Sequence, residues 1–144
     1  MLVPRMFFSE SVIEKRNPLS ATARRAGWVG CNILLSGIPE DGKIAIVSAG
    51  VPIPEKQVRR EFERVRRLAE LPPSLRGWTV DVLNAVRRLR QSTFSLQELY
   101  QFEPELQAAH PRNKNVRPKM RQQLQVLRDL GLLDFTGRGT YQVH

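Results

Sequence analysis

The sequence predicts an α+β fold in which short strands of an incomplete sheet precede a winged helix-turn-helix. Three observations lead to this fold class. Residues 1–54 hold short β-type runs separated by Pro and Gly, residues 55–70 have the apolar period of one helix, and residues 75–144 have three helical segments before a Gly-rich hairpin. The Pro-Pro step at 72–73 predicts a stiff linker, so we expect two domains, 1–71 and 72–144.

The first third of the chain carries apolar runs of β-type composition at 2–3, 33–35 and 43–47. The sequence Pro-Glu-Asp-Gly at 39–42 indicates a turn, so we expect the last two runs to form a hairpin. A hairpin with one flanking strand is marginally stable in water. We therefore expect a piece of a larger sheet. The predicted helix at 55–70 has an apolar stripe on one face and arginines on the opposite face, and we expect these arginines to be exposed to solvent.

The second half of the chain begins with a helix at 79–89, in which apolar residues recur along one face. Ser95 and Glu98 have the spacing of a capping box, which predicts the start of a second helix. Pro104 follows closely, so we expect this helix to be short and to break or restart there.

A third helix is predicted between Asn115, its expected cap, and Gly131, its expected left-handed end. The runs at 132–135 and 140–143 flank a Gly-Arg-Gly turn and predict a hairpin with Arg138 at its tip. Three helices followed by such a hairpin form the winged helix arrangement. In it the third helix enters the major groove of DNA and the wing touches the backbone.

The polar side of this third helix is the strongest functional signal in the sequence. It carries arginines and glutamines and has no acid before Asp129. Arg pairs with guanine edges and Gln with adenine edges, so such a face can read bases as well as phosphates. The predicted base-reading residues are Arg117, Arg121, Gln122 and Gln125, and the predicted DNA-backbone contacts are Lys114, Lys119, Arg138, Arg24 and Arg25.

Composition favours a polyanionic partner. The net charge is +9, from 23 Lys and Arg against 14 Asp and Glu, and nucleic acid is the partner that such a charge favours. A single cysteine, Cys31, excludes an internal disulfide, and two histidines without neighbouring ligands predict no metal site. No apolar run reaches the roughly 18 residues of a membrane span, and no signal-peptide pattern is present. We therefore expect a cytoplasmic protein with no membrane partner.

No catalytic residue is predicted. The segment Glu40-Asp41-Gly42-Lys43 has the acid-x-Lys spacing of metal-dependent nucleases, but it lies in a predicted turn and no Asp is suitably placed before it. The sequence also has no phosphate-binding Gly loop and no Ser-His-Asp or Cys-His set.

Five stretches of the sequence carry a family resemblance: Arg16-Asn17-Pro18-Leu19, residues 22–33 around Trp28, Arg76-Gly77-Trp78-Thr79, residues 121–129 and Gly137-Arg138-Gly139. They resemble the DpnI-type methyl-directed restriction endonucleases and the related Dam-replacing proteins, and the similarity follows the chain in order over nearly its whole length. The resemblance implies the tail of a PD-(D/E)xK nuclease domain followed by a winged helix, both of which recognise GATC with methylated adenine.

The resemblance also bears on cofactors and partners. In that family the catalytic acids, which hold magnesium, and a four-cysteine zinc site precede the part that this chain resembles. We therefore expect no cofactor and no cleavage by this chain alone. The implied protein is a monomeric, nucleoid-associated bacterial binder of duplex GATC with methylated adenine. Trp28 and Trp78 are the candidates for methyl recognition, and we expect residues 75–144 to carry most of the methyl preference.

Two other functions remain open at this stage. The chain is either the C-terminal half of a split or truncated nuclease whose catalytic half is a separate polypeptide, or a winged-helix transcriptional regulator.

Overall fold

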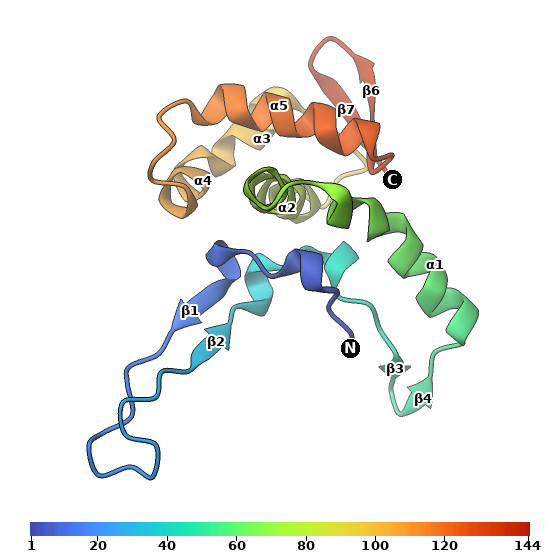
Figure 1. The fold of residues 1–144 in the computed structure, drawn as a ribbon. Coiled ribbons are helices and arrows are strands. Elements are labelled where there is room, and N and C mark those ends of the chain that lie inside the picture. Colours follow the sequence, from blue (N-terminus) through green and yellow to red (C-terminus); the bar gives the residue numbers. More distant parts are fainter.

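Helix α2 (Pro73–Arg88) lies in the middle of the molecule, with an N-terminal layer on one side and the C-terminal domain on the other (Figure 1). The computed structural model describes residues 1–144. Helix α1 (Glu55–Arg66) continues into a 3-10 turn, Arg67–Glu70, and leads from the N-terminal layer to α2. The helix predicted at 55–70 is thus confirmed, and the one predicted at 79–89 begins earlier, because Pro73 takes a first-turn position that needs no N–H partner.

The N-terminal layer consists of two small antiparallel hairpins and four 3-10 turns. It also has an isolated antiparallel bridge between Leu2 and Ile44. The strands are β1 (Ile13–Lys15) with β2 (Cys31–Ile33) and β3 (Val47–Ser48) with β4 (Val51–Pro52). The 3-10 turns are Arg5–Phe7, Glu10–Val12, Leu35–Gly37 and Glu40–Gly42.

The hairpin predicted between residues 33–35 and 43–47 is wrong. Ile33 pairs instead with Ile13, twenty residues earlier in the chain. The segment expected to reverse the chain is a 3-10 turn packed on Phe7: a Cβ added at Gly42 would lie 2.7 Å from the Phe7 ring. This turn therefore docks the layer on its neighbours, and glycine is needed because the aromatic ring lies against its backbone.

Three polar contacts attach the N-terminal layer to successive turns of α2. Ser11 donates to Asp81 Oδ1 at 2.7 Å, and the Asn84 side chain donates to the Ser36 carbonyl at 3.3 Å. One turn further on, Arg87 forms a bidentate pair with Asp41, with both N–O distances at 2.6 Å. Positions three apart lie on one side of a helix, so this side of α2 is fixed to three separate segments.

The opposite side of α2 packs against α5 (Val116–Asp129). Thr79 and Gln123 meet in this buried interface, where Thr79 Oγ1 lies 2.7 Å from the Gln123 amide and 2.9 Å from the Leu75 carbonyl. A hydroxyl has one proton to donate. If Thr79 donates to Leu75 and the Gln123 amide group turns its NH2 toward Thr79, the buried Nε2 gains the partner that it otherwise lacks.

The helices of the C-terminal domain start and end largely as predicted. Ser95 and Glu98 form the expected capping box, and the hydrogen bond from the Ser95 backbone lowers the pKa of Glu98. Pro104 stands at the start of α4, and Gly131 has the left-handed φ of 77° that ends α5. The helical elements before α5 are α3 (Leu96–Leu99), a 3-10 turn at Tyr100–Phe102 and α4 (Glu103–Ala109).

Asn115 precedes α5, as predicted, but its side chain makes no capping bond. The Asn113 side chain instead accepts a hydrogen bond from the Asn115 backbone at 2.7 Å. The turn before α5 is therefore stabilised by the side chain of Asn113 rather than by that of Asn115.

The predicted C-terminal hairpin is present and belongs to a three-stranded sheet. Its strands, β6 (Leu133–Gly137) and β7 (Thr140–Val143), pair around the Arg138–Gly139 turn. Strand β5 (Thr93–Ser95) was not predicted and pairs with β7, giving the order β5-β7-β6. Helices followed by this sheet make the domain a winged helix-turn-helix.

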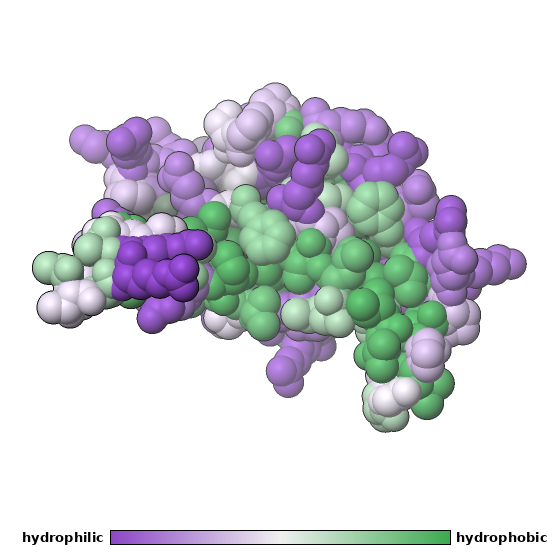
Figure 2. Space-filling model, turned by 60° about the horizontal axis from the view of Figure 1, so that its bottom comes forward, coloured by the Kyte–Doolittle hydropathy of each residue, from purple (hydrophilic) through white to green (hydrophobic).

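One hydrophobic core of 21 buried residues joins the two halves of the chain, from Met6 and Phe7 to Leu132 and Leu133. The N-terminal layer also has an uncovered apolar side. Of the 14 large hydrophobic side chains that are exposed, 13 come before residue 52 and the other is Phe135. Figure 2 shows hydrophobic side chains gathered in a band across the side turned forward, which is the underside of Figure 1.

The Arg87–Asp41 pair predicts a large stability difference. We expect Asp41→Asn to lower the free energy of unfolding by about 3 kcal/mol, because it leaves a mostly buried guanidinium without its counter-charge. The Asp41 side chain is 5% exposed and that of Arg87 is 17% exposed. Urea unfolding followed by circular dichroism measures the change.

The matched control is Glu55→Gln, which breaks the Arg59–Glu55 pair on the surface of α1, where both side chains are 76% exposed. Its effect should stay below about 1 kcal/mol. Equal effects of the two variants would contradict the role of Asp41 in attaching the N-terminal layer.

Candidate nucleic-acid interface

Helix α5 turns an apolar side inward and an arginine- and glutamine-rich side outward. Val116, Met120, Leu124 and Leu127 are buried in the core shared with α2. At 100° per residue, this burial leaves the predicted base-reading side chains exposed. The four that the sequence analysis selected lie on this outer side: Arg117, Arg121, Gln122 and Gln125.

Two of these side chains contact Tyr100, which lies in the 3-10 turn between α3 and α4. Arg121 Nη1 donates to the Tyr100 hydroxyl at 2.7 Å, and the Arg117 guanidinium lies 4.8 Å from the centre of the Tyr100 ring. Arg117 Nε also donates to Glu103 Oε2 at 2.6 Å. The sequence analysis missed Tyr100 and Glu103. The signal available for Tyr100 was its place on the second helical segment, just beyond the capping box.

The cations predicted to contact the DNA backbone lie in four places. Lys119 is on α5 and donates to Gln122 Oε1 at 2.9 Å. Lys114 is exposed in the loop before α5, and Arg138 is exposed at the wing turn. Arg24 and Arg25 lie between β1 and β2, on the hairpin that these strands form, which is called the N-terminal hairpin. The structure therefore does not bring all five cations together.

The wing is fixed against the helices. At its turn Gly139 has a φ of 70°, and its carbonyl accepts from the Leu96 backbone at 2.8 Å. Tyr141 of β7 stacks on the buried Phe94, with ring centres 5.4 Å apart. Burial raises the pKa of Tyr141 and the nearby Tyr100 raises it further, while Arg121 acts in the opposite direction.

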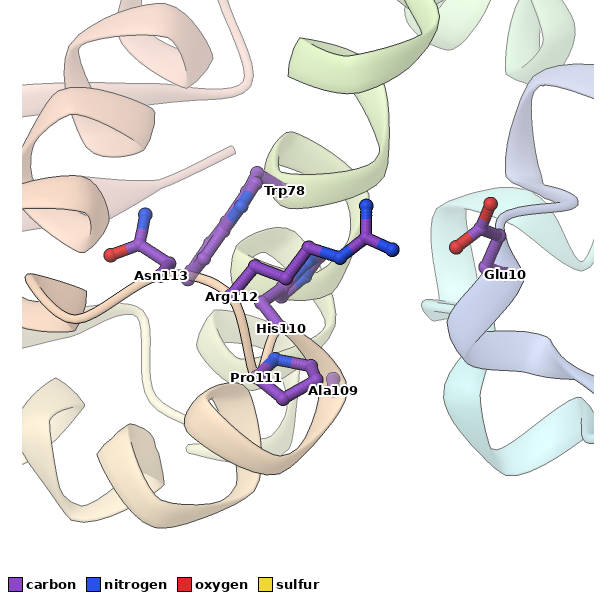
Figure 3. A pocket seen from close by; sticks show the side chains of 7 residues that line it. All are labelled: Glu10, Trp78, Ala109, His110, Pro111, Arg112 and Asn113. Carbon is purple, nitrogen blue, oxygen red and sulfur yellow. The ribbon is translucent and has the colours of Figure 1, made fainter.

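Trp78 lies in the middle of α2 and stacks on His110, with ring centres 3.8 Å apart and planes 15° apart (Figure 3). Trp78 is 7% exposed, so its indole is largely covered. His110 Nε2 is 2.7 Å from Asp81 Oδ2, which fixes the loop before α5 to α2. A cavity of about 590 Å³ adjoins the stack, and Figure 3 shows Arg112 extending toward the segment that carries Glu10.

Trp28 lies on the long hairpin that continues β1 and β2 and extends away from α5 (Figure 1). The backbones of Leu19 and Trp28 pair at 2.9 Å, which extends the hairpin beyond its regular strands. The indole is 53% exposed, and a Cβ at Gly30 would lie 2.9 Å from it, so glycine there lets the ring fold over the chain. Exposed Arg24 and Arg25 are near the end of the same hairpin.

The magnesium and zinc that the resemblance implies do not fit this chain. Residues 1–144 contain no group of three or more His, Cys, Asp or Glu side chains placed to hold a metal ion. Asp41 of the acid-x-Lys segment is paired with Arg87, and Cys31 is a free, exposed thiol. None of the helices combines the length and the apolar character needed to cross a membrane.

The winged helix and the basic outer side of α5 define a DNA-binding helix-turn-helix protein. The family model described as the Dam-replacing HTH domain matches residues 74–143, and that of the Dam-replacing family matches residues 1–71. The chain belongs to the Dam-replacing family. The two matches meet at the linker that enters α2.

The acid beside Arg117 predicts an increase in DNA affinity when its charge is removed. We expect Glu103→Gln to tighten duplex binding by about fivefold at low salt, because the variant removes a negative charge worth about 1 kcal/mol next to the binding face. Fluorescence anisotropy with a labelled duplex measures the affinity, and the gain should shrink as salt screens the charge.

Glu105→Gln is the control, because Glu105 is on the same helix but pairs with Arg88 of α2. It should change the affinity by less than Glu103→Gln does. An equal gain from both variants would mean that total charge matters rather than the position of Glu103.

Proposed function

We propose that this chain reads duplex DNA in a sequence-specific way, with a preference for GATC carrying methylated adenine, and that α5 is the reading helix. The observation that carries the proposal is the outer side of α5, which presents Arg117, Arg121, Gln122 and Gln125 and has no acid before Asp129. Arg suits guanine and Gln suits adenine, and GATC offers both bases in the major groove. Membership of the Dam-replacing family supports the choice of sequence.

In this proposal the loop and the wing grip the DNA backbone on either side of α5. Lys114 precedes the helix and Arg138 stands at the wing turn, the two positions from which a winged helix reaches phosphates. Lys119 has a mixed role, because it also holds the Gln122 side chain. Arg24 and Arg25 belong to a second, separate contact on the N-terminal hairpin.

The methyl preference is assigned to the winged helix-turn-helix. An added methyl group is an apolar feature of the major groove, so the side chains that sense it must lie beside the base edges that α5 reads. Trp28 is free but lies on a hairpin that extends away from α5, and Trp78 is covered by His110. Of the two tryptophans, Trp78 acts through the loop that it fixes, and Trp28 serves another contact.

A second candidate function is favoured by the uncovered apolar side of the N-terminal layer. In this alternative the chain is the DNA-reading half of a two-chain nuclease, and a separate polypeptide with metal-binding carboxylates covers that side. Contiguous apolar surface of this kind is typical of a protein–protein interface.

The roles proposed for α5 and its flanks predict two kinds of loss. We expect Arg121→Ala and Gln122→Ala to reduce the preference for methylated GATC over a duplex with a changed site by about 1–3 kcal/mol each, because each loses a paired base contact. Lys114→Ala should weaken binding to every duplex alike and lower the slope of log affinity against log salt by about one. Anisotropy titrations at several salt concentrations measure both.

If all three variants lose affinity equally on every duplex, α5 is an electrostatic grip and the proposed reading function is wrong. The proposed reading function is also wrong if the full chain binds duplexes with changed and unchanged sites with equal affinity.

The assignment of methyl sensing predicts that Trp28→Ala has little effect. The full-length variant should keep the ratio of affinities for methylated and unmethylated GATC within about twofold, because an indole on a hairpin that extends away from α5 contributes little to the contacts made there. The full chain is the right material, since residues 75–144 share their core with the N-terminal layer. Loss of the methyl preference in Trp28→Ala would transfer the sensor to the N-terminal hairpin.

A further inference from the structure

We propose that Tyr100 is a positioning residue of the DNA-reading surface, which holds the guanidinium groups of Arg117 and Arg121 in place for base contacts. The inference rests on the proposed function, because it names a residue that acts through the reading side chains of α5. It adds a role for the turn between α3 and α4, which has no base-reading residue of its own in that proposal.

The contacts of Tyr100 separate its two chemical parts. Its hydroxyl accepts a hydrogen bond from Arg121 at 2.7 Å, and its ring lies under the guanidinium of Arg117 at 4.8 Å. These arginines are four residues apart and so share one side of α5. One side chain thus holds two neighbouring cations through different interactions, a hydrogen bond for one and a cation–π contact for the other.

Tyr100 is itself held by its surroundings. Its backbone N–H donates to the carbonyls of Leu96 and Glu98 at the end of the capped helix α3. The Gln101 side chain donates to the Glu98 carbonyl at 2.8 Å, which closes the same turn. The ring is half-buried and packs against the hydrophobic core. The position of the hydroxyl therefore depends on rigid helical backbone rather than on a free loop.

The physical effect of this arrangement is preorganisation. A free arginine side chain samples many rotamers and loses that freedom when it pairs with a guanine, and a guanidinium already held near its binding geometry loses less. The gain applies to the duplex with a matching base and is absent where the guanidinium contacts only phosphate. Tyr100 therefore raises discrimination between sequences rather than affinity for DNA in general.

The experiment compares Tyr100→Phe and Tyr100→Leu in the full chain. Affinities are measured for methylated GATC duplex and for duplexes with one base pair of the site changed at a time. Tyr100→Phe removes the hydroxyl alone and should reduce discrimination by about tenfold at the base pair read by Arg121. Tyr100→Leu removes the ring as well and should reduce discrimination at a second base pair. Binding to a duplex without the site, and the salt slope, should stay unchanged.

Three further measurements separate positioning from a structural effect. In an Arg121→Ala background, Tyr100→Phe should cause no additional loss, because the group that it positions is gone. The matched control is Ser48→Ala, which removes an exposed hydroxyl on the β3–β4 hairpin, away from α5 (Figure 1), and it should leave discrimination unchanged. Thermal unfolding should give the same Tm for wild type and Tyr100→Phe.

Two results would overturn the inference. If Tyr100→Phe and Tyr100→Leu both discriminate as well as a wild type that does discriminate, Tyr100 positions neither arginine. If Tyr100→Phe weakens binding to all duplexes alike, the Tyr100 hydroxyl contacts a phosphate directly. As a neutral donor it releases no counterion, so the salt slope stays unchanged in that case too. A wild type that fails to discriminate would overturn the proposed function and, with it, the positioning role, so the two failures are distinct.

Discussion

The packing of α2 on two sides is the constraint on which the rest of the structure depends. One side buries Thr79 against α5, and the other is attached to the N-terminal layer through Asp81, Asn84 and Arg87. A helix buried on both sides cannot shift for one neighbour without disturbing the other, because protein interiors are close-packed. Helix α2 therefore sets the direction of α5 and of the DNA-binding face. The boundary between the two family matches, residues 1–71 and 74–143, falls at the first turn of this helix.

The same helix also sets the loop that leads into α5. Trp78 and Asp81, one turn apart on α2, hold His110 by stacking and by hydrogen bonding. Because Ser11 donates to the other oxygen of that carboxylate, the N-terminal layer, α2 and the loop before α5 meet at one residue. The binding surface is thus supported from behind by a polar network, while Tyr100 holds the guanidinium groups of Arg117 and Arg121 and Glu103 pairs with Arg117.

The features that could be predicted well from the sequence depend on interactions between residues that are close in the chain. The capping box at Ser95, the left-handed Gly131 and the inner side of α5 depend on residues a few positions apart, and all three are present. The N-terminal pairing failed because Ile13 finds Ile33 across a long excursion that no turn signal marks. Strand β5 was not predicted for the same reason, since its partner β7 is more than forty residues away in the chain.

The same distinction between local and long-range interactions explains which parts of the candidate site could be predicted. Periodicity alone is enough to put Arg117, Arg121, Gln122 and Gln125 on one side of a helix, and the structure has them there. Contacts between separate elements were beyond such reasoning, so the Tyr100 ring under Arg117 and the stack of Trp78 on His110 had no signature in the sequence.

The uncovered apolar side of the N-terminal layer has a consequence for the protein in solution. A net charge of +9 makes copies of the chain repel one another, and that repulsion opposes contact between their apolar sides. Salt shortens the range of the repulsion from about 10 Å at 0.1 M to about 3 Å at 1 M and leaves the hydrophobic attraction in place. We therefore expect rising ionic strength to act on this molecule in two opposite senses, by releasing it from polyanions and by lowering the barrier to contact between its apolar sides, and its colloidal stability to depend on the balance between them.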